Sequence, residues 1–326
     1  MIRTFDLRAG IETELARVEQ ALHDWTDSRV PAVAAIADEM LQAGGKRVRP
    51  ALVILASRAC GATGASERLV NVACSVELMH MASLIHDDVV DRADTRRGRP
   101  AANATWGNHK AVLSGDYLWA VATSVLANDG DTEVIRVLSD TSIKMIEGVV
   151  SELVSDDGDD LMDRCLEITR LKTAELMGAC CEVGGIVAGE GWAVREPLSD
   201  YGRSLGMAYQ ITDDLLDLTG DPDTLGKPVG GDLREGKITL PIVFTLQSVN
   251  GRDRERLTSI LDDGQIEDTD LQFALDLVCD CGAADRCRSL ASDYIERAER
   301  ALSSLPPSLA RDQLQELDRF ILSRDH

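Results

Sequence analysis

Hydrophobic residues recur every three or four positions along most of the chain, which is the spacing of amphipathic helices that bury one face. Ile11, Leu15, Val18 and Leu22 form one such stripe, and residues 33–41 carry a second. No segment shows the strict alternation of apolar and polar residues that is typical of a half-buried β-strand. The pattern therefore predicts an all-α fold.

Short segments rich in glycine, proline and aspartate separate the predicted helices, and none is long enough to be an interdomain linker. They fall at residues 44–50, 61–64, 98–100, 128–131, 156–160, 189–197, 220–236 and 304–307. We therefore expect residues 1–326 to form a single domain, a bundle of roughly ten or more helices with long helices at its centre.

An acidic pentad, Asp-Asp-x-x-Asp, occurs twice, each time near the expected C-terminal end of a long helix. Its aspartates are Asp87, Asp88 and Asp91 in the first copy and Asp213, Asp214 and Asp217 in the second. The first and last aspartates of each copy lie about one turn apart on one helix face, so their charges repel. A divalent cation relieves this repulsion, and hard carboxylate oxygens suit Mg²⁺. A solvated helix face would explain one pentad more simply, but two copies within apolar helices favour metal sites.

Two basic clusters run against the acidic balance of the chain. Lys46, Arg47 and Arg49 lie on a glycine-rich turn between two predicted helices, and Arg96 and Arg97 follow the first pentad. Glycine lets a ligand approach the backbone closely, and guanidinium groups suit phosphate oxygens. Either cluster alone would be interpreted as a solvated turn. Beside acidic metal sites they indicate two diphosphate pockets, one acting through Mg²⁺ and the other directly through Arg and Lys.

Other polar residues interrupt apolar helices or flank a glycine-rich loop. Gln210 lies one turn before the second pentad, and Lys172 and Thr173 interrupt an apolar run. A buried lysine is unfavourable unless it meets an anion, whereas a lysine that snorkels to the surface costs little. Lys227 and Lys237 flank the loop, which is as readily a solvated connection as a lid over the site.

The sequence Glu77-Leu78-Met79-His80 matches the Glu-x-x-His ligand pair of di-iron helix bundles. A di-iron site needs a second such pair, and the other four histidines do not supply one. We therefore interpret His80 as a hydrogen-bond donor, neutral or cationic, two turns before the first pentad.

Composition narrows the class of protein further. The net charge of −22 argues against nucleic acid as a partner. No stretch reaches the ~18 apolar residues of a transmembrane helix, and the first ten residues lack the apolar run of a signal peptide. The eight cysteines form no Cys-x-x-Cys pair and are expected to be reduced. We expect a soluble cytoplasmic protein without a transmembrane segment.

Several longer motifs together resemble the trans-isoprenyl diphosphate synthases, also called polyprenyl synthetases, from about residue 30 to residue 245. They are GGKRVRP at 44–50, ELMHMASLIHDDVVDRADTRRG at 77–98, WGNHKAVLSGDYL at 106–118, RLKTAELM at 170–177, and YQITDDLLDLTGD with LGKPVGGDLREGKITLP at 209–241. The resemblance implies the isoprenoid synthase fold, a helical bundle around a central prenyl-chain cavity, and a homodimer.

The resemblance also implies a reaction. In that family Mg²⁺ ions, three in each active site, bridge the two pentads and the diphosphate of an allylic substrate such as dimethylallyl, geranyl or farnesyl diphosphate. The substrate ionises to an allylic carbocation, which the double bond of isopentenyl diphosphate attacks. Loss of a proton completes a head-to-tail condensation.

The resemblance implies roles for the residues at matching motif positions. All six pentad aspartates would serve the metals, directly or through water, and Asp87 and Asp213 would be essential to catalysis. Isopentenyl diphosphate would be held by Lys46, Arg49, His80 and Arg97, and the allylic diphosphate by Arg96, Lys172, Lys227 and Lys237. Lys172, Thr173 and Gln210 would also direct carbonyl, hydroxyl and amide dipoles at the carbocation.

The chain departs from the family pattern at one position. Where the family usually has Glu-Gly-Glu-x-x-Gln, this chain has Glu147-Gly148-Val149-Val150-Ser151-Glu152. A carboxylate at Glu152 therefore replaces an amide near the metal site, which leaves the number and affinity of the metal ions open.

Product length is expected to depend on the helix before the first pentad. A growing prenyl tail would pass Ser83, Ala82 and Met79, and in the family an aromatic residue four or five positions before the motif limits products to short chains. Ser83 and Ala82 are small. We therefore expect a medium or long product of about C30 to C50, with a short-chain farnesyl or geranylgeranyl diphosphate synthase as the alternative.

Two more distant alternatives are weaker. A class I terpene cyclase shares the helical fold and first motif, but its second metal motif is usually of a different type, and it does not need the basic cluster at 44–49. A non-catalytic subunit of a heteromeric synthase would be expected to have lost aspartates, and this chain retains all six.

Overall fold

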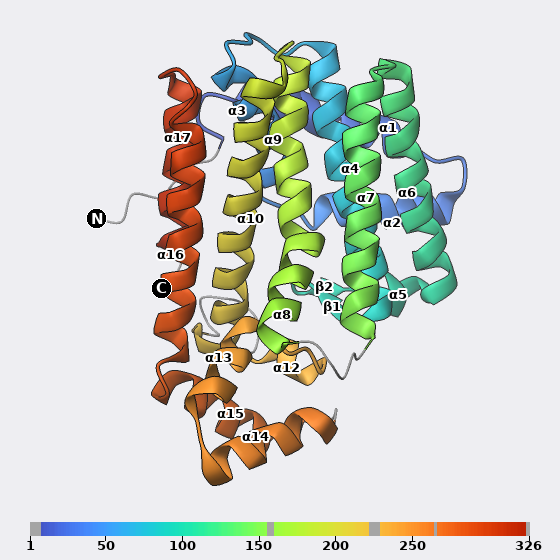
Figure 1. Ribbon diagram of the computed structural model, residues 1–326. Helices are drawn as coiled ribbons and strands as arrows, with labels where there is room; N and C mark the ends of the chain where they lie inside the picture. The colour runs from blue at the N-terminus through green and yellow to red at the C-terminus, as the bar shows by residue number, and fades with distance from the viewer. Residues whose placement is uncertain (1–7, 155–159, 222–228, 264–265, 324–326) are drawn as a thin grey trace. The chain divides into compact units, whose positions relative to one another are not determined.

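The computed structural model describes residues 8–154, 160–221, 229–263 and 266–323. Helices make up most of these residues, and the strands among them are two short segments, β1 (Thr95–Arg96) and β2 (Arg99–Pro100), as Figure 1 shows. The all-α prediction is confirmed.

The chain divides into two compact units, each assembled from distant segments. The first contains Met1–Thr141, Met177–Gly202 and Ala301–Leu317, and the second contains Ser142–Leu176, Arg203–Arg300 and Asp318–His326. Neither unit is therefore a contiguous stretch of sequence. That residues 1–326 form one functional domain stays a prediction.

The first unit holds the N-terminal helices and the first pentad. Its complete helices are α1 (Glu12–Thr26), α2 (Pro31–Gln42), α3 (Val48–Ala59), α4 (Glu67–Val90), α5 (Ala102–Trp106) and α6 (Asn108–Asp129). It also takes parts of α7 (Thr132–Leu153), α9 (Glu175–Val187), α10 (Trp192–Thr219) and α17 (Leu309–Leu322).

Helix α4 is the core of the first unit. It packs against α6 most extensively and also against α1 and α3, because its apolar residues lie on all sides. Ser66 caps its first turn by accepting a hydrogen bond from the backbone N–H of Leu69 (3.2 Å). At its other end Gly115 of α6 lies against the His86 ring, since a Cβ there would come within 2.3 Å of His86 Nε2. This close packing fixes the pentad-bearing end of α4.

Helix α4 also qualifies, by length and composition, as a possible membrane-spanning helix. Its most apolar window has a mean hydropathy of 1.3, and 72% of that window is buried inside the structure. The core helix of a soluble protein has the same properties, so this is weak evidence for a membrane span. The expectation that no segment is apolar enough to span a membrane therefore does not hold for α4 by length and composition alone.

The second unit holds the second pentad and the C-terminal helices. Its elements are the end of α7, α8 (Leu161–Thr169), the π-helix η1 (Arg170–Ala174), most of α10, α12 (Gly231–Arg234), α13 (Leu240–Ser248), α14 (Gly251–Asp263), α15 (Asp268–Asp280) and most of α16 (Ala283–Leu302). Aliphatic side chains from α10, α12, α13, α14 and α15 form one buried cluster, including Leu218, Leu233, Ile242, Leu257 and Leu271.

The two pentads occupy equivalent places on their helices. Asp87 and Asp88 lie in the last turn of α4, and Asp91 follows it directly. Asp213, Asp214 and Asp217 lie in the last two turns of α10, as predicted. The C-terminal end of a helix carries partial negative charge, which adds to that of the aspartates and favours a bound cation.

Candidate active site

The first pentad divides into aspartates of different burial. The side chains of Asp87 and Asp91 are half-buried, whereas Asp88 is 0% exposed. Asp88 Oδ1 accepts a hydrogen bond from Arg96 Nε at 2.5 Å, and its backbone oxygen accepts one from Asn103 Nδ2 at 3.1 Å. Asp88 therefore organises the segment after α4, and Asp87 and Asp91 remain the better candidates for metal ligands.

A two-residue hairpin turn presents the arginines after the pentad. Arg96 pairs with Arg99 across the β1–β2 ladder, and Arg97 and Gly98 at the tip have φ values of 52° and 73°. Positive φ at both positions is typical of a type I′ turn and is costly for arginine. Arg97 Nη1 donates a hydrogen bond to the backbone oxygen of Gly44. The hairpin therefore brings the two predicted basic clusters together.

Arg47 is a structural cation within the first basic cluster. It adopts a left-handed conformation (φ 51°) and turns into the protein, where it pairs with Glu19 (2.6 Å) and with Glu77 (2.9 Å). Burial lowers the pKa of Arg47, but the two carboxylates outweigh that effect and the pKa is raised. Because Glu77 is engaged with Arg47, the Glu-x-x-His pair is not a metal-ligand pair here.

Arg49 differs from Arg47 in that no carboxylate partner is found for it among the described residues. Its side chain is half-buried and its Nε atom is fully buried without a hydrogen-bond partner among the residues described. An uncompensated guanidinium in this setting is unfavourable unless an anion binds it. Arg49 is therefore the strongest single candidate for an anion-binding residue in the first unit.

The pKa of His80 is lowered in part by the positive charge around it. Burial, followed by the charges of Arg49, Arg97, Arg96 and Arg47, holds the pKa of His80 well below its usual value of 6.5. The lowered pKa favours the neutral imidazole, one of the two states expected for His80. The same effect shows that four arginines converge on one region of the first unit.

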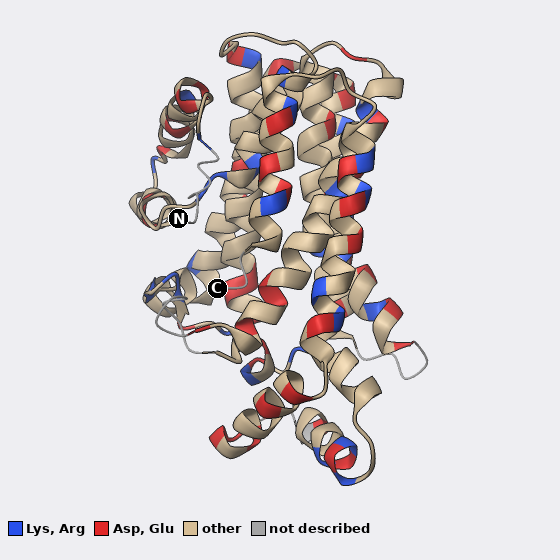
Figure 2. Cartoon of the chain, turned by 90° about the vertical axis from the view of Figure 1, so that its left-hand side faces the viewer, with Lys and Arg blue, Asp and Glu red and all other residues tan. Residues whose placement is uncertain are grey.

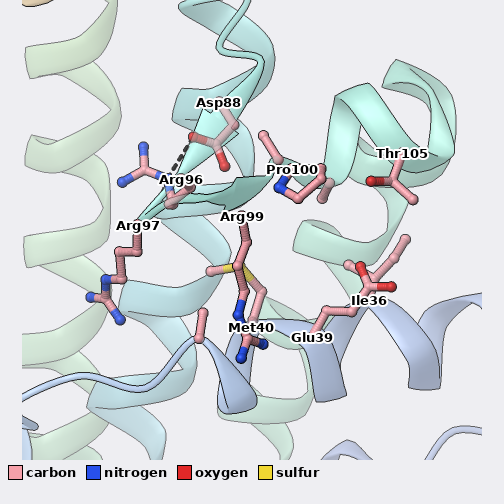
Figure 3. Close-up of a pocket in the computed structure, with 12 residues that line it drawn as sticks. Ile36, Glu39, Met40, Asp88, Arg96, Arg97, Arg99, Pro100 and Thr105 are labelled. Carbon is pink, nitrogen blue, oxygen red and sulfur yellow. Dashed lines mark hydrogen bonds and ion pairs between the residues drawn. The ribbon is translucent and has the colours of Figure 1, made fainter. Parts of the chain in front are cut away.

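A pocket of about 280 Å³ adjoins the hairpin (Figure 3). Ile36 and Met40 of α2 give it apolar walls, and Arg96, Arg97 and Arg99 line its polar side. In Figure 3 the Arg99 side chain extends beside Met40, while Arg96 turns to Asp88. Two of its three arginines, Arg96 and Arg97, are those predicted to hold the substrates.

The second pentad has an amide and a hydroxyl as its nearest partners. Thr173 Oγ1 donates a hydrogen bond to Gln210 Oε1 (2.9 Å), and Gln210 Nε2 donates one to Asp214 Oδ1 (2.7 Å). The structure thus joins three predicted site residues into one chain of hydrogen bonds across η1 and α10. A π-helical turn of the kind that contains Thr173 is common at functional sites.

Asp214 lies in a concentration of negative charge. Burial raises its pKa well above the usual 3.8, and the charges of Asp232, Asp213 and Asp217 raise it further, although the Gln210 hydrogen bond opposes the shift. A group of carboxylates that suppresses its own ionisation is expected to favour a divalent cation. Asp213 is half-buried, which suits contact with a metal ion.

Asp217 has a local structural role. Its Oδ2 atom accepts a hydrogen bond from the backbone N–H of Asp232 (3.0 Å), and a Cβ at Gly231 would lie 3.3 Å from Asp217 Oδ1. The backbone oxygen of Asp217 accepts a hydrogen bond from Gly230 N at 2.6 Å. Asp217 therefore holds the start of α12 against the end of α10.

Two of the predicted lysines, Lys172 and Lys237, have carboxylate partners. Lys172 of η1 pairs with Glu152 of α7, and Lys237 Nζ donates a hydrogen bond to Glu235 Oε2 at 2.8 Å. Lys46 is exposed on its turn. Lys227 lies outside the described residues, so its place at the site stays a prediction.

The predicted chain-length residues lie on α4 at different depths. Met79 and Ala82 are buried, whereas Ser83 is half-buried and donates a hydrogen bond to the backbone oxygen of His80 (2.9 Å). Ser83 also shares a helix face with Asp87, one turn away. Ser83 is therefore the better placed of the two small residues to border a substrate bound at Asp87.

Most of the chain matches one known protein family. A family model described as polyprenyl synthetase matches residues 30–278. The chain belongs to the polyprenyl synthetase family.

Relatives of this polyprenyl synthetase align over almost the whole chain. It is 38% identical over 320 residues to an all-trans-nonaprenyl-diphosphate synthase (geranyl-diphosphate specific) of Rhodobacter capsulatus, covering 98% of this chain and 97% of the relative. It is 35% identical to a short chain isoprenyl diphosphate synthase of Methanothermobacter thermautotrophicus, covering 98% of each. Because the identity to these two relatives is similar, overall identity does not indicate the product length of this synthetase. Its own residues have to be considered instead.

A solved structure supports the fold. The polyprenyl synthase of Caulobacter crescentus CB15, complexed with calcium and isoprenyl diphosphate, has a TM-score of 0.93 to this chain at 37% identity, covering 98% of both. The isoprenoid synthase fold expected for the chain is confirmed, and the chain is a trans-prenyltransferase.

The residues of this synthetase fit a metal ion that is shared with a ligand. Within the described part of the chain, no three His, Cys, Asp or Glu side chains gather closely enough to hold a metal by themselves. The hard oxygens of Asp87 and Asp91 in the first unit suit Mg²⁺, and so do Asp213 and the charge around Asp214 in the second. Mg²⁺ commonly takes further ligands from water and substrate phosphates, so each group of donors fits Mg²⁺ bound together with a diphosphate.

Sequence reasoning missed some functional neighbours in this synthetase. It gave no role to Asp232, which contributes to the raised pKa of Asp214, or to Asn103, which holds the backbone after α4. The residues alone placed the three cations of the first basic cluster together, and only the family resemblance left Arg47 out of the substrate site. Figure 2 shows acidic and basic residues interspersed over the helices. Because charged residues are so widespread, the sequence does not indicate which of them come together in the fold. The aspartate beside a Gly-Gly pair at 230–232 was the one available signal.

Proposed function

We propose that this polyprenyl synthetase condenses isopentenyl diphosphate head-to-tail with an allylic diphosphate to make a trans-polyprenyl diphosphate of about C30 to C50. The half-buried guanidinium of Arg49, whose Nε atom has no hydrogen-bond partner among the described residues, carries this proposal together with the arginines around it. A terpene cyclase needs only one diphosphate site, whereas this cluster provides for a second diphosphate held without metal.

In the first unit, Arg49, Lys46 and Arg97 hold isopentenyl diphosphate through charge-assisted hydrogen bonds. The neutral His80 lies in their field and donates a hydrogen bond to the same diphosphate. Binding two or more negative charges here offsets the repulsion among the arginines, which is the reason that His80 would become easier to protonate in the complex.

In the second unit, Lys172, Thr173 and Gln210 bind the allylic diphosphate and stabilise the carbocation formed from it. Mg²⁺, when bound at the pentads, neutralises the charge that develops on the leaving diphosphate. Lys172 and Lys237 add positive charge to the same leaving group. The Thr173–Gln210–Asp214 chain orients the hydroxyl and amide dipoles in advance, so little reorganisation is needed when the carbocation forms.

Three Mg²⁺ ions in each active site are proposed, with Asp87, Asp91 and Asp213 as direct ligands. Asp88 and Asp217 do not bind the ions directly in this proposal, because their carboxylates already interact with Arg96 and with the start of α12. They help to position the ligand aspartates instead. This division modifies the expectation that all six aspartates serve the metals equally.

The proposed product length rests on Ala82 and Ser83. Both are small, and Ser83 lies on the Asp87 face of α4, so α4 itself places no aromatic ring one turn before Asp87. The nonaprenyl activity named for one relative supports a long product, and the short-chain activity named for another keeps farnesyl or geranylgeranyl diphosphate as the alternative.

Incubation with Mg²⁺, labelled isopentenyl diphosphate and allylic primers of several lengths tests the proposal. Chromatography of the dephosphorylated products should give linear alcohols of about C30 to C50. Cyclic hydrocarbons formed without isopentenyl diphosphate would indicate a terpene cyclase instead. Turnover that requires a second polypeptide would indicate a subunit of a heteromeric synthase.

A homodimer in the cytoplasm is proposed with this function. Ile143, Ile146, Val150 and Leu153 form an exposed stripe on one face of α7, and Ile146 is 57% exposed. Exposed apolar stripes of this kind mark protein interfaces. Sedimentation should give a dimer, and Ile146→Glu should shift the mass to that of a monomer. All eight cysteines are free, which suits a reducing compartment.

A further inference from the structure

Helix α7 approaches the π-helix η1 unusually closely in the second unit. A Cβ at Gly148 would lie 2.8 Å from Leu171 Cβ and 3.0 Å from Lys172 Cγ, so only glycine permits this approach. One turn later on the same face of α7, the Glu152 carboxylate forms an ion pair with Lys172 Nζ. The close packing therefore places the Glu152 carboxylate beside Lys172, a residue of the candidate active site.

The Glu152–Lys172 pair is partly shielded from solvent. The side chains are 24% and 21% exposed respectively, so water screens their attraction less than that of a surface pair. The charges of Glu152 and of Asp214 in the second pentad both act on the Cys165 thiol. Burial, followed by Asp214 and Glu152, raises the pKa of this thiol to about 12, although Arg164 opposes the shift.

A carboxylate at this position has a different effect from an amide. A glutamine side chain can accept a hydrogen bond from Lys172 but leaves the ammonium charge uncompensated. Glu152 neutralises that charge, and a diphosphate that approaches Lys172 must compete with it. The carboxylate also repels the incoming diphosphate directly.

We propose that Glu152 is an internal competitor for the diphosphate at Lys172 and thereby weakens binding of the allylic substrate and of the diphosphate product. It is a positioning residue that acts through Lys172. The inference rests on the proposed function in one respect, namely that Lys172 contacts the allylic diphosphate.

The proposed effect is specific to one of the two diphosphate sites. Arg49 and Arg97, the candidates for isopentenyl diphosphate, have other surroundings within the first unit, where Arg97 contacts the Gly44 oxygen. Glu152 has its ion pair with Lys172 alone among the described residues. Changing Glu152 should therefore alter allylic binding while leaving isopentenyl diphosphate binding nearly unchanged.

The direct test is calorimetric binding of inorganic diphosphate and of a non-ionising allylic thiolodiphosphate, each with saturating Mg²⁺. Glu152→Gln keeps the side-chain shape and removes the charge. It should tighten both ligands about three- to tenfold, and the gain should shrink at high salt. Glu147→Gln, at an exposed position of the same helix, is the matched control and should leave both dissociation constants unchanged.

A double-mutant cycle with Lys172→Met shows whether Glu152 acts through the lysine. In the Lys172→Met background, Glu152→Gln should change the dissociation constants by less than about twofold. In steady-state kinetics, Glu152→Gln should lower KM for the allylic primer but not for isopentenyl diphosphate. Restoring the charge with Glu152→Asp should return the primer KM towards its original value.

The outcomes separate the possibilities. Weaker diphosphate binding in Glu152→Gln would mean that Glu152 holds Lys172 in a productive position, and unchanged binding with altered thermal stability would mean a structural pair; either result overturns the proposal. A gain of equal size in the Lys172→Met background would also overturn it. If the wild-type protein carries out no condensation, the proposed function fails, whereas condensation with unaltered diphosphate binding in Glu152→Gln defeats this inference alone.

Discussion

The two acidic pentads have the same pattern of aspartates but opposite electrostatic surroundings. The first lies beside arginines, and Asp88 pairs directly with Arg96. The second lies among carboxylates, and Asp214 has a raised pKa because of its burial and of three neighbouring aspartates. Identical motifs on equivalent helix ends therefore impose different requirements on the ligand that binds there.

The pentads also differ in which aspartate has a structural role. In the first, the second position, Asp88, holds the hairpin; in the second, the last position, Asp217, holds the start of α12. The difference arises from the segment that each aspartate holds, a two-residue hairpin turn in one case and the backbone at 230–232 in the other. A repeated motif is thus not a repeated site.

The largest expected effect separates ligand aspartates from structural ones. Asp87→Ala and Asp213→Ala should each lower kcat about a thousandfold or more, since each removes a candidate ligand of a metal that stabilises the leaving diphosphate. Asp88→Asn and Asp217→Asn should retain more activity and lose thermal stability instead. Single-turnover rates and thermal melts of the four variants measure both effects.

Chelator provides the control for this division. Wild-type activity should vanish in excess chelator and return with Mg²⁺, because carboxylates without internal cations need the metal. Full activity in chelator, or equal losses in all four aspartate variants, would show that the two roles are not separate.

The second prediction concerns the cations beside each pentad. Arg49→Ala should raise KM for isopentenyl diphosphate about ten- to a hundredfold, because it removes a half-buried charge that lacks any other described partner. Lys237→Ala should raise KM for the allylic primer instead, and by less, because its Glu235 pairing already weakens it. Initial rates with each substrate varied in turn give both values, and parallel changes in both KM values would reject the assignment.

The third prediction uses the residue one turn before each pentad. α10 carries Tyr209 in the place where α4 carries Ser83. Ser83→Phe would place a ring beside the tail on α4 and should shift the main product towards C15 or C20. Turnover of the first condensation should change by less than about tenfold, since the diphosphate sites are untouched. Product chromatography measures the shift.

Ala82→Phe provides the comparison for that experiment. Ala82 is fully buried, so a ring there should destabilise the protein by about 1–3 kcal/mol through overpacking. If a folded Ser83→Phe variant keeps the original product distribution, the tail does not follow this face of α4, and the medium- or long-chain proposal loses its main support.

The smallest expected effect is on the stability of the metal-free protein. Because the folded-state pKa of Asp214 is raised above its usual 3.8, the folded state takes up a proton that the unfolded state has lost. Stability should therefore fall as pH rises through the window above 3.8. Asp214→Asn, which carries no charge, should raise the melting temperature at neutral pH by a few degrees and reduce this pH dependence.

Melting temperatures with and without Mg²⁺ complete the comparison between pentads. Mg²⁺ with inorganic diphosphate should stabilise the wild-type protein more than Asp214→Asn, because the cation offsets repulsion that the variant no longer has. A metal-free Asp214→Asn variant that melts lower than wild type at neutral pH would mean that the Gln210 hydrogen bond outweighs the buried charge.

Much of this protein can be predicted from local sequence patterns. The period of about 3.6 residues predicts helices, because an amphipathic helix must bury its apolar face whatever it packs against. The positions of the pentads on their helices are set by the same period. The basic turn at 44–50 and the Arg96-Arg97 pair indicate anion binding, since such charges run against a net charge of −22.

Only the tertiary structure decided which charged groups are neutralised. Arg47 and Arg49 are two residues apart and chemically identical, yet Arg47 is buried between Glu19 and Glu77, whereas Arg49 Nε lacks a described partner. The partners come from helices far away in the sequence, and their distance sets the interaction energy. Sequence therefore determined where the charges are, and packing determined which of them are left to bind a ligand.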